Sequence, residues 1–226
     1  GSFKVCARLL APAAVPIGLI LLEPNNGTVL LLLGELLALL VIMGVEKKYW
    51  GFPLLIIATV AIGAAMLLPY VSGRIEVFLH PEKDLLGRGH QPYQAKIAIG
   101  SGGWLGVGIS HSKQKFFYLP MQHTDFIFSI IAEETGIIGC LMLLILFCLF
   151  AYFGMKIAWQ MKNNFALITT LGFTLLISLQ ACINICVTIG LLPTKGIGLP
   201  FISYGNSSLI CFLCMMGLIA NFVDQE

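Results

Sequence analysis

The residues best suited to chemistry in this sequence stand at the start of a long apolar run. His123, Thr124 and Asp125 come just before it, and Glu133 and Glu134 follow about two helical turns inside it. A carboxylate at the boundary between water and hydrocarbon is poorly hydrated, so we expect the pKa of Asp125 to lie above the roughly 3.9 of a free aspartate. The pattern therefore predicts a centre of proton transfer at the mouth of a membrane helix.

A second polar group surrounds Lys195, in a connection rich in glycine, proline and hydroxyl residues. Ser207 and Ser208 begin the next apolar run, where the first amides of a helix have no partner within the helix. A lysine here could simply extend toward lipid headgroups. A lysine beside hydroxyls and free amides is also suited to binding a lipid diphosphate, and the residues alone leave both interpretations open.

Five glycines fall between residues 100 and 108, directly after a stretch, residues 94–99, that could form a short amphipathic helix. Glycines let backbone amides approach an anionic group closely. The spacing matches neither the dinucleotide-binding motif nor the P-loop, so a re-entrant turn at the membrane surface is an equally good interpretation.

Composition places these groups in a membrane protein, because 58% of the residues are hydrophobic and only 11% are charged. A helix of about 20 apolar residues crosses about 30 Å of hydrocarbon. Windows of this kind occur at residues 5–22, 28–45, 52–70, 126–154, 165–190 and 204–223. The alternation typical of barrel strands is missing, so the sequence predicts an all-α polytopic bundle of about six spans.

Basic residues set the expected orientation of this bundle. They cluster at every second connection, whereas the short connections between carry only Lys195, which predicts that both termini are cytoplasmic. The segment 71–125 then forms a long extracytoplasmic loop within a single integral membrane domain, residues 1–226. The net charge of +2 is too small to indicate a nucleic-acid partner.

Three polar residues lie inside predicted spans, and each has a plain and a functional interpretation. Glu35 should face other helices, as a buried packing residue or as part of a proton relay. Gln180 and Asn184 are one helical turn apart, where amides most often join helices. Together the three could also belong to a transporter of a lipid-linked precursor.

Four motifs become specific when they are considered together. They resemble the SEDS family (shape, elongation, division and sporulation), whose FtsW and RodA branches are peptidoglycan polymerases, and the chain resembles the C-terminal portion of that family. Residues 193–196, PTKG, favour the division branch, FtsW. The motifs are EPNNGT at 23–28, IAIGSGG at 97–103, HTDFIFSIIAEETG at 123–136 and GLLPTKGIGLPFISYGNSS at 190–208.

The resemblance implies a peptidoglycan glycosyltransferase that polymerises lipid II at the outer face of the bacterial cytoplasmic membrane. Asp125 would be the catalytic base, or would hold the attacking hydroxyl together with a divalent cation such as Mg²⁺. The substrate-binding residues implied are Arg74, Gly102, Gly103, His123, Thr124, Lys195, Ser207 and Ser208. The partners implied are lipid II, a class B penicillin-binding protein transpeptidase and other divisome proteins. Two alternatives stay open: a lipid II flippase and a non-catalytic scaffold for the transpeptidase.

Overall fold

The computed structural model describes residues 19–20, 26–47, 50–51, 73, 76–84, 87, 89–112, 125–194 and 196–225. The chain divides into two compact units, Gly1–Ile75 and Glu76–Glu226, and each is considered by itself. Every regular element in the described ranges is a helix, which confirms the predicted all-α class. The prediction of a single domain over residues 1–226, with 71–125 as its outer loop, stays a prediction.

The described part of the first unit centres on α2, Asn26–Ile42. This helix overlaps the predicted span at 28–45 but ends three residues earlier, before a turn at Gly44, whose φ is +67°. Glu35 lies near its middle and is half-buried. The predicted span at 52–70 lies outside the described residues, as does that at 5–22 apart from residues 19–20.

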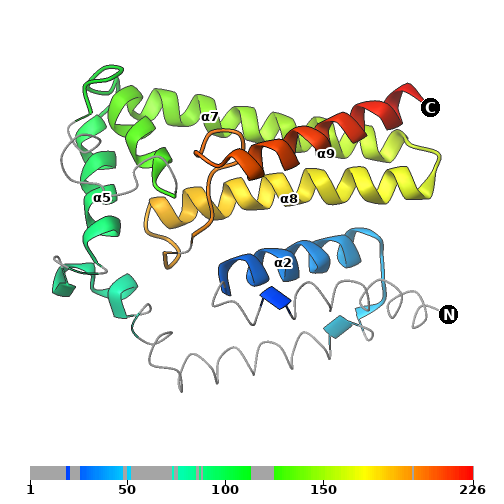
Figure 1. Cartoon of the computed structure of the whole chain (residues 1–226), viewed down its shortest axis with the longest axis horizontal. Helices are drawn as coiled ribbons and strands as arrows, with labels where there is room; N and C mark the ends of the chain where they lie inside the picture. The colour runs from blue at the N-terminus through cyan, green and yellow to red at the C-terminus, as the bar shows by residue number, and fades with distance from the viewer. Residues whose placement is uncertain are drawn as a thin grey trace. The chain divides into compact units, whose positions relative to one another are not determined.

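The second unit contains three helices that are long and apolar enough to cross a membrane. They are α7 (Ile127–Gln160), α8 (Asn164–Thr188) and α9 (Asn206–Asp224), and they confirm the last three predicted spans. Figure 1 shows them running side by side, with α7 and α8 joined by a tight turn. The start of α7, the end of α8 and the α8–α9 connection therefore come together in one part of the bundle.

Local sequence determines where α8 begins and ends. The side chain of Asn163 accepts a hydrogen bond of 2.9 Å from the amide of Phe165, which caps the first turn. Beyond the last turn, Gly190 adopts a φ of +81°, a conformation that glycine reaches at little cost. The amide of Leu191 then returns to the carbonyl of Cys186 at 2.8 Å and closes the helix end.

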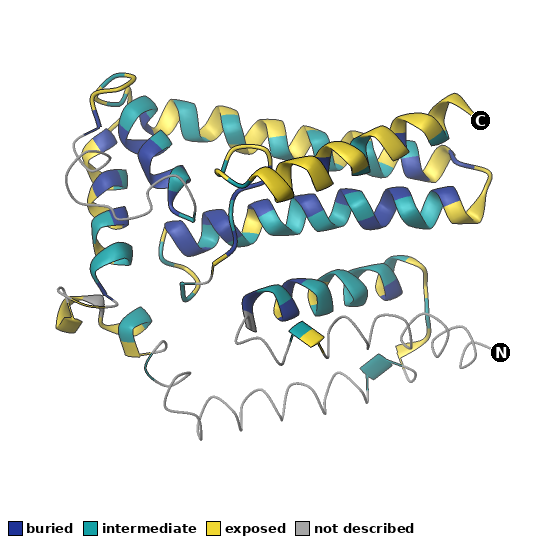
Figure 2. Cartoon of the chain, viewed as in Figure 1, coloured by how far each residue is buried: buried dark blue, intermediate teal, exposed yellow. Residues whose placement is uncertain are grey.

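Burial differs along the three long helices. In the apolar 18-residue stretch of each helix, 33% of the residues of α8 are buried, compared with 6% of those of α7 and 11% of those of α9. Figure 2 shows buried residues along α8 and mostly exposed ones along α9. The exposed side chains of α7 and α9 are largely apolar, as contact with lipid requires; they include Ile138, Leu141, Met142, Leu209, Ile210 and Leu213.

Before α7, the structure describes α5 (His90–Gly102) and the short 3₁₀ helix η1 (Pro81–Asp84). The predicted helix at 94–99 is confirmed and extended at both ends. Of the glycine-rich stretch at 100–108, for which a re-entrant turn was one interpretation, the first three residues instead complete the last turn of α5. The turn begins at Gly103, whose φ is +55°.

Helix α7 is broken at Gly136, whose φ of +67° and ψ of −165° do not belong to a helix. Figure 1 shows the part before the break inclined to the rest. In a continuous helix the amides of residues 137 and 138 would bond the carbonyls of residues 133 and 134. Here residues 103–108 insert between these groups and bond all four: Ile137 N to Gly103 O (3.0 Å), Ile138 N to Trp104 O (3.4 Å), Val107 N to Glu133 O (2.9 Å) and Gly108 N to Glu134 O (3.1 Å).

Small residues make this insertion possible. A β-carbon at Gly102 would overlap the carbonyl of Ala132, and one at Gly106 would overlap the carbonyl of Glu134. At Gly136 a β-carbon would lie 2.5 Å from the amide nitrogen of Gly106. These glycines let the backbones of α5, the inserted segment (residues 103–108) and α7 meet without side chains between them. The re-entrant turn proposed from the sequence is therefore built into the bundle.

Candidate functional site

Asp125 lies two residues before α7, at the start of the inclined part of that helix. Its neighbour Phe126 is buried and packs with Ala95 of α5. The carboxyl group is half-buried, and desolvation raises its pKa above the ordinary value of 3.8, the direction predicted from the sequence. A carboxylate in this setting is a better proton acceptor than one in open water.

One side chain of α8 joins the Asp125 backbone to the α8–α9 connection. The amide nitrogen of Asn184 donates to the carbonyl of Asp125 at 2.8 Å and to the carbonyl of Ile197 at 2.7 Å. Asn184 is 1% exposed, so these bonds form out of contact with water. Its side-chain oxygen is buried and has no hydrogen-bond partner among the residues that the structure describes. The backbone at Asp125 and the α8–α9 connection are therefore held together by the side-chain amide of Asn184.

One helical turn earlier on α8, Gln180 holds the next part of the connection. Its side-chain nitrogen donates to the carbonyl of Gly198 at 3.0 Å. The hydroxyl of Ser203 accepts a bond of 2.6 Å from the amide of Leu199, which shapes the turn that follows. Gln180 and Asn184 thus anchor irregular backbone of the connection, whereas the sequence favoured bonds between helices.

The Asp125 side chain itself faces this connection. A β-carbon at Gly196 would lie 3.6 Å from the Oδ2 atom of Asp125. This distance is that of ordinary van der Waals contact, so Gly196 lies directly beside the Asp125 carboxylate. Residues distant in the sequence, one before α7 and one after α8, meet at this point.

The other predicted site residues have different outcomes. Ser207 and Ser208 are exposed in the first turn of α9, as predicted, and the Ser208 hydroxyl donates to the carbonyl of Gly205 at 2.8 Å. Their contact with substrate stays a prediction. Arg74, His123, Thr124 and Lys195 lie outside the described residues.

Gly102 and Gly103 have structural roles in the described chain. Gly102 is buried in the last turn of α5 against α7, and the carbonyl of Gly103 bonds the broken part of α7. In these positions they allow α5 to pack closely against α7, which begins two residues after Asp125. Their predicted contact with substrate is not tested by this arrangement.

Glu133 is a buried residue whose surroundings the sequence did not reveal. It is 3% exposed, and it accepts a short hydrogen bond from the hydroxyl of Ser112, which is fully buried. Ser112 lies 21 residues earlier, beyond the inserted segment, and local spacing carries no signal for such a pair. The bond ties the chain just after the inserted segment to the part of α7 that precedes the break.

The side chains required for a metal site are not grouped in the described ranges. There, no three histidine, cysteine, aspartate or glutamate residues lie close enough together to hold an ion. The backbone carbonyls of Asp125 and Ile197 are both bonded to the side-chain nitrogen of Asn184. The divalent cation suggested by the sequence stays a prediction, and no step of the mechanism proposed below passes through it.

Comparison with known proteins now adds to this geometry. The family model for the FtsW, RodA and SpoVE proteins, described as "Cell cycle protein", matches residues 2–226. The chain is 39% identical over 220 residues to the probable peptidoglycan glycosyltransferase FtsW of Legionella pneumophila, covering 96% of this chain and 56% of that protein. It is 43% identical over 232 residues to the protein of the same name from Alkalilimnicola ehrlichii, with coverages of 100% and 56%. The chain thus spans little more than half the length of these relatives.

Two solved structures share the architecture. One is a chain of a peptidoglycan synthase complex studied for the coordination of polymerization and crosslinking, with a TM-score of 0.80, 28% identity, and coverage of 97% of this chain and 61% of that one. The other is the rod shape determining protein RodA of Thermus thermophilus, as a D255A mutant, with a TM-score of 0.61, 26% identity and coverages of 96% and 55%. The sequence motifs, the helical fold and these matches agree, and the chain belongs to the FtsW, RodA and SpoVE family of membrane proteins.

Proposed function

We propose that this chain forms the catalytic part of a peptidoglycan glycosyltransferase of the division branch, which polymerises lipid II at the outer face of the cytoplasmic membrane. The observation that carries the proposal is the meeting of Asp125 with the α8–α9 connection at Gly196, maintained by Asn184. The relatives named FtsW support the reaction class. Both termini of the chain face the cytoplasm in this proposal.

In the proposed reaction, Asp125 acts as general base. It takes the proton from the attacking sugar hydroxyl, whose oxygen forms a new bond to the anomeric carbon of the second substrate. The bond from that carbon to the diphosphate breaks, and its electron pair leaves with the undecaprenyl diphosphate. A carboxylate whose pKa is raised by burial suits this step, because its proton affinity is closer to what transfer near neutral pH requires.

The leaving diphosphate needs positive charge and hydrogen-bond donors. Lys195 supplies the charge in this proposal, with Arg74 as a second cation and with the amides and hydroxyls at Ser207 and Ser208 as donors. His123 and Thr124 orient the loop that carries Asp125. The described neighbours of Lys195 support this placement, because Gly196 lies against the Asp125 carboxylate.

Transport is the second candidate, and the break in α7 is the observation that bears on it. Transporters use broken helices whose unwound carbonyls coordinate ions. In this chain the carbonyls freed at the break, those of Glu133 and Glu134, are already bonded by the inserted segment. Because the inserted segment already bonds these carbonyls, the break has a structural role in this chain, and we favour polymerisation over transport.

The testing experiment is glycan synthesis from purified lipid II by the full-length protein together with its transpeptidase partner. We expect a glycan ladder from the wild type and a loss of about 100-fold or more in rate for Asp125→Asn. Protein folding and partner binding are measured on the same samples. A ladder unchanged by Asp125→Asn would remove the assigned base, and no ladder from the wild type would favour transport or scaffolding.

A further inference from the structure

The α8–α9 connection contains a backbone conformation that its sequence does not favour. Phe201 has a φ of +65°, and it is one of two non-glycine residues with a positive φ in the described ranges. The amide of Ile202 bonds the carbonyl of Leu199 at 3.2 Å, so Phe201 is the third residue of a tight turn. A positive φ at this position favours glycine, and a β-carbon makes it costly. Such a conformation persists only where other interactions offset its cost.

The ring of Phe201 supplies such interactions, because it contacts two helices. Its centroid lies 6.4 Å from that of Phe150 on α7, in an edge-to-face arrangement, and 5.3 Å from that of Phe212 on α9. Phe212 is buried, whereas Phe201 is 38% exposed, so part of its ring packs and part stays open. Aromatic pairs at these distances add to the stability that area burial provides. We call these three residues the aromatic clamp.

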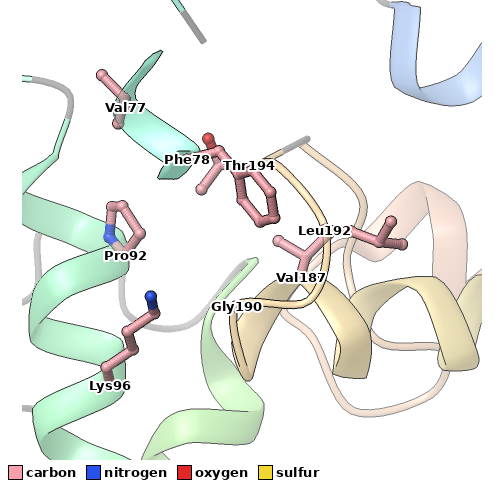
Figure 3. A pocket seen from close by; sticks show the side chains of 8 residues that line it. All are labelled: Val77, Phe78, Pro92, Lys96, Val187, Gly190, Leu192 and Thr194. Atoms are coloured by element: carbon pink, nitrogen blue, oxygen red, sulfur yellow. The ribbon is translucent and has the colours of Figure 1, made fainter. Parts of the chain in front are cut away.

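The rest of the connection is held unevenly. Just after α8, Leu192 and Thr194 line a small opening beside α5 (Figure 3). Farther along, side chains of α8 bond the backbone, and Leu199 is 1% exposed in a cluster with Phe128 of α7. Phe201 is the residue at which this fixed stretch also reaches α9.

The aromatic clamp lies between two groups that the proposed reaction uses. Gly196, beside the Asp125 carboxylate, precedes Phe201 in the connection, and Ser207 and Ser208 follow it in the first turn of α9. A movement of the connection at Phe201 would change the distance between the base and the donors of α9. Contacts to α7 and α9 at this one residue oppose that movement.

We propose that Phe201 is a positioning residue for the polymerisation reaction. Its ring holds the connection in a strained turn between α7 and α9, and it thereby fixes the start of α9 relative to Asp125. This inference rests on the function proposed above. The role differs from that of Asn184, which holds the backbone of Asp125 itself.

The test compares Phe201→Ala with Phe201→Gly in the full-length protein together with its transpeptidase partner. Both variants lose the ring, but only glycine removes the β-carbon that makes the positive φ costly. We therefore expect Phe201→Gly to unfold at a higher temperature than Phe201→Ala. Both should lower kcat for glycan synthesis by about tenfold with a smaller change in KM, because a small displacement of a reacting group is enough for such a loss. Phe201→Tyr keeps the ring and should retain most of the wild-type kcat.

A purely structural role for Phe201 predicts a different result. In that case kcat would follow stability, and Phe201→Gly would be more active than Phe201→Ala. That outcome would overturn the positioning role, and so would a wild-type kcat in both variants.

Ser110 offers a matched control, because it has the same conformation in the same kind of turn. Its φ is +66°, and the amide of His111 bonds the carbonyl of Gly108 at 3.1 Å. Ser110 has no ring to lose, so Ser110→Gly should preserve or raise the melting temperature and leave kcat unchanged. An equal loss of kcat in Ser110→Gly and Phe201→Gly would contradict the proposal, since it would assign the effect to the turn conformation instead of the ring.

Hydrogen exchange separates this inference from the proposed function, because it needs no turnover. The amides of Ile202 and Ser203 bond the carbonyl of Leu199, at 3.2 and 2.9 Å, and they report whether the turn is held. Faster exchange there in Phe201→Ala, in a protein that makes no glycan, would show that the aromatic clamp holds while the proposed function fails. Unchanged exchange and unchanged kcat in an active protein would do the reverse.

Discussion

Two regions of this molecule hold non-helical backbone within the helical bundle, and they do so by different means. At the break in α7, backbone amides and carbonyls of the inserted segment bond the broken helix directly. At the α8–α9 connection, the side-chain amides of Gln180 and Asn184 reach out from α8 to backbone carbonyls. The first arrangement depends on the lack of side chains, and the second on two particular side chains.

Because of this difference, substitutions in the two regions should affect folding and catalysis to different degrees. A backbone ladder tolerates many side chains pointing away from it, but it fails when a β-carbon blocks the close approach of the two backbones. A side-chain anchor can be removed while the backbone path remains possible, so its loss should move the anchored group. We therefore expect substitutions at the break to act on folding, and those at the connection to act on catalysis as well.

The largest effect is expected at the break, where α5 offers a matched pair of glycines. Gly102→Ala should destabilise the protein by about 4 kcal/mol or more, because its β-carbon would overlap the backbone of Ala132. Gly100→Ala, two residues earlier in the same helix, meets no atom within 4 Å and should be neutral or slightly stabilising. Thermal unfolding in one detergent compares the two. Similar melting temperatures would show that the break is not held by close backbone contact.

An intermediate effect is expected at the connection. Asn184→Ala leaves the carbonyls of Asp125 and Ile197 without their shared donor, at a cost of about 2 to 4 kcal/mol. We expect kcat to fall about tenfold or more with a smaller change in KM, since the base is displaced while other substrate contacts remain.

Two further variants test that explanation. Asn184→Asp keeps the size of the side chain but removes its donors, so it should be at least as harmful as Asn184→Ala. Gln180→Ala loses a single bond, to Gly198, and should cost less in both stability and kcat. If Asn184→Asp behaved like the wild type, the amide bonds would not be what positions Asp125.

The smallest effect concerns the charge of Asp125. Burial raises the pKa of this carboxyl in the folded protein above 3.8, so the folded state favours the protonated form. Stability is then lost as the pH rises from the unfolded pKa through the folded one. Asp125→Asn, which cannot ionise, should melt above the wild type at neutral pH, and the difference should shrink in mildly acidic buffer. A wild type that is more stable than Asp125→Asn at neutral pH would contradict the raised pKa.

Much of the fold could be predicted because its signals are local. Apolar runs and the residues that interrupt them located α7, α8 and α9, and the partial burial of Asp125 followed from its place at the end of such a run. The break at Gly136 could not be predicted this way, because the residues that stabilise it, in the inserted segment, lie about 30 positions earlier in the sequence.

The site was partly predictable for the same reason. Asp125 stood out as an acid at a helix mouth, and Lys195 as a cation on a short connection. The role of Asn184 depends on two carbonyls, one 59 residues before it and the other 13 after it, and an amide in a span carries no sign of which backbone it will bond.

The bend in α7 also has a consequence for how the protein is assembled. Taken alone, Ile127–Gln160 would satisfy its backbone best in lipid as one uninterrupted helix, since each freed amide or carbonyl would otherwise face hydrocarbon. The inserted segment supplies replacements for all of them, and it precedes α7 in the chain, so it is synthesised first. The shape of α7 therefore depends on its partner: a peptide of these residues in a bilayer should be straight, and the bend should arise only once the inserted segment has docked.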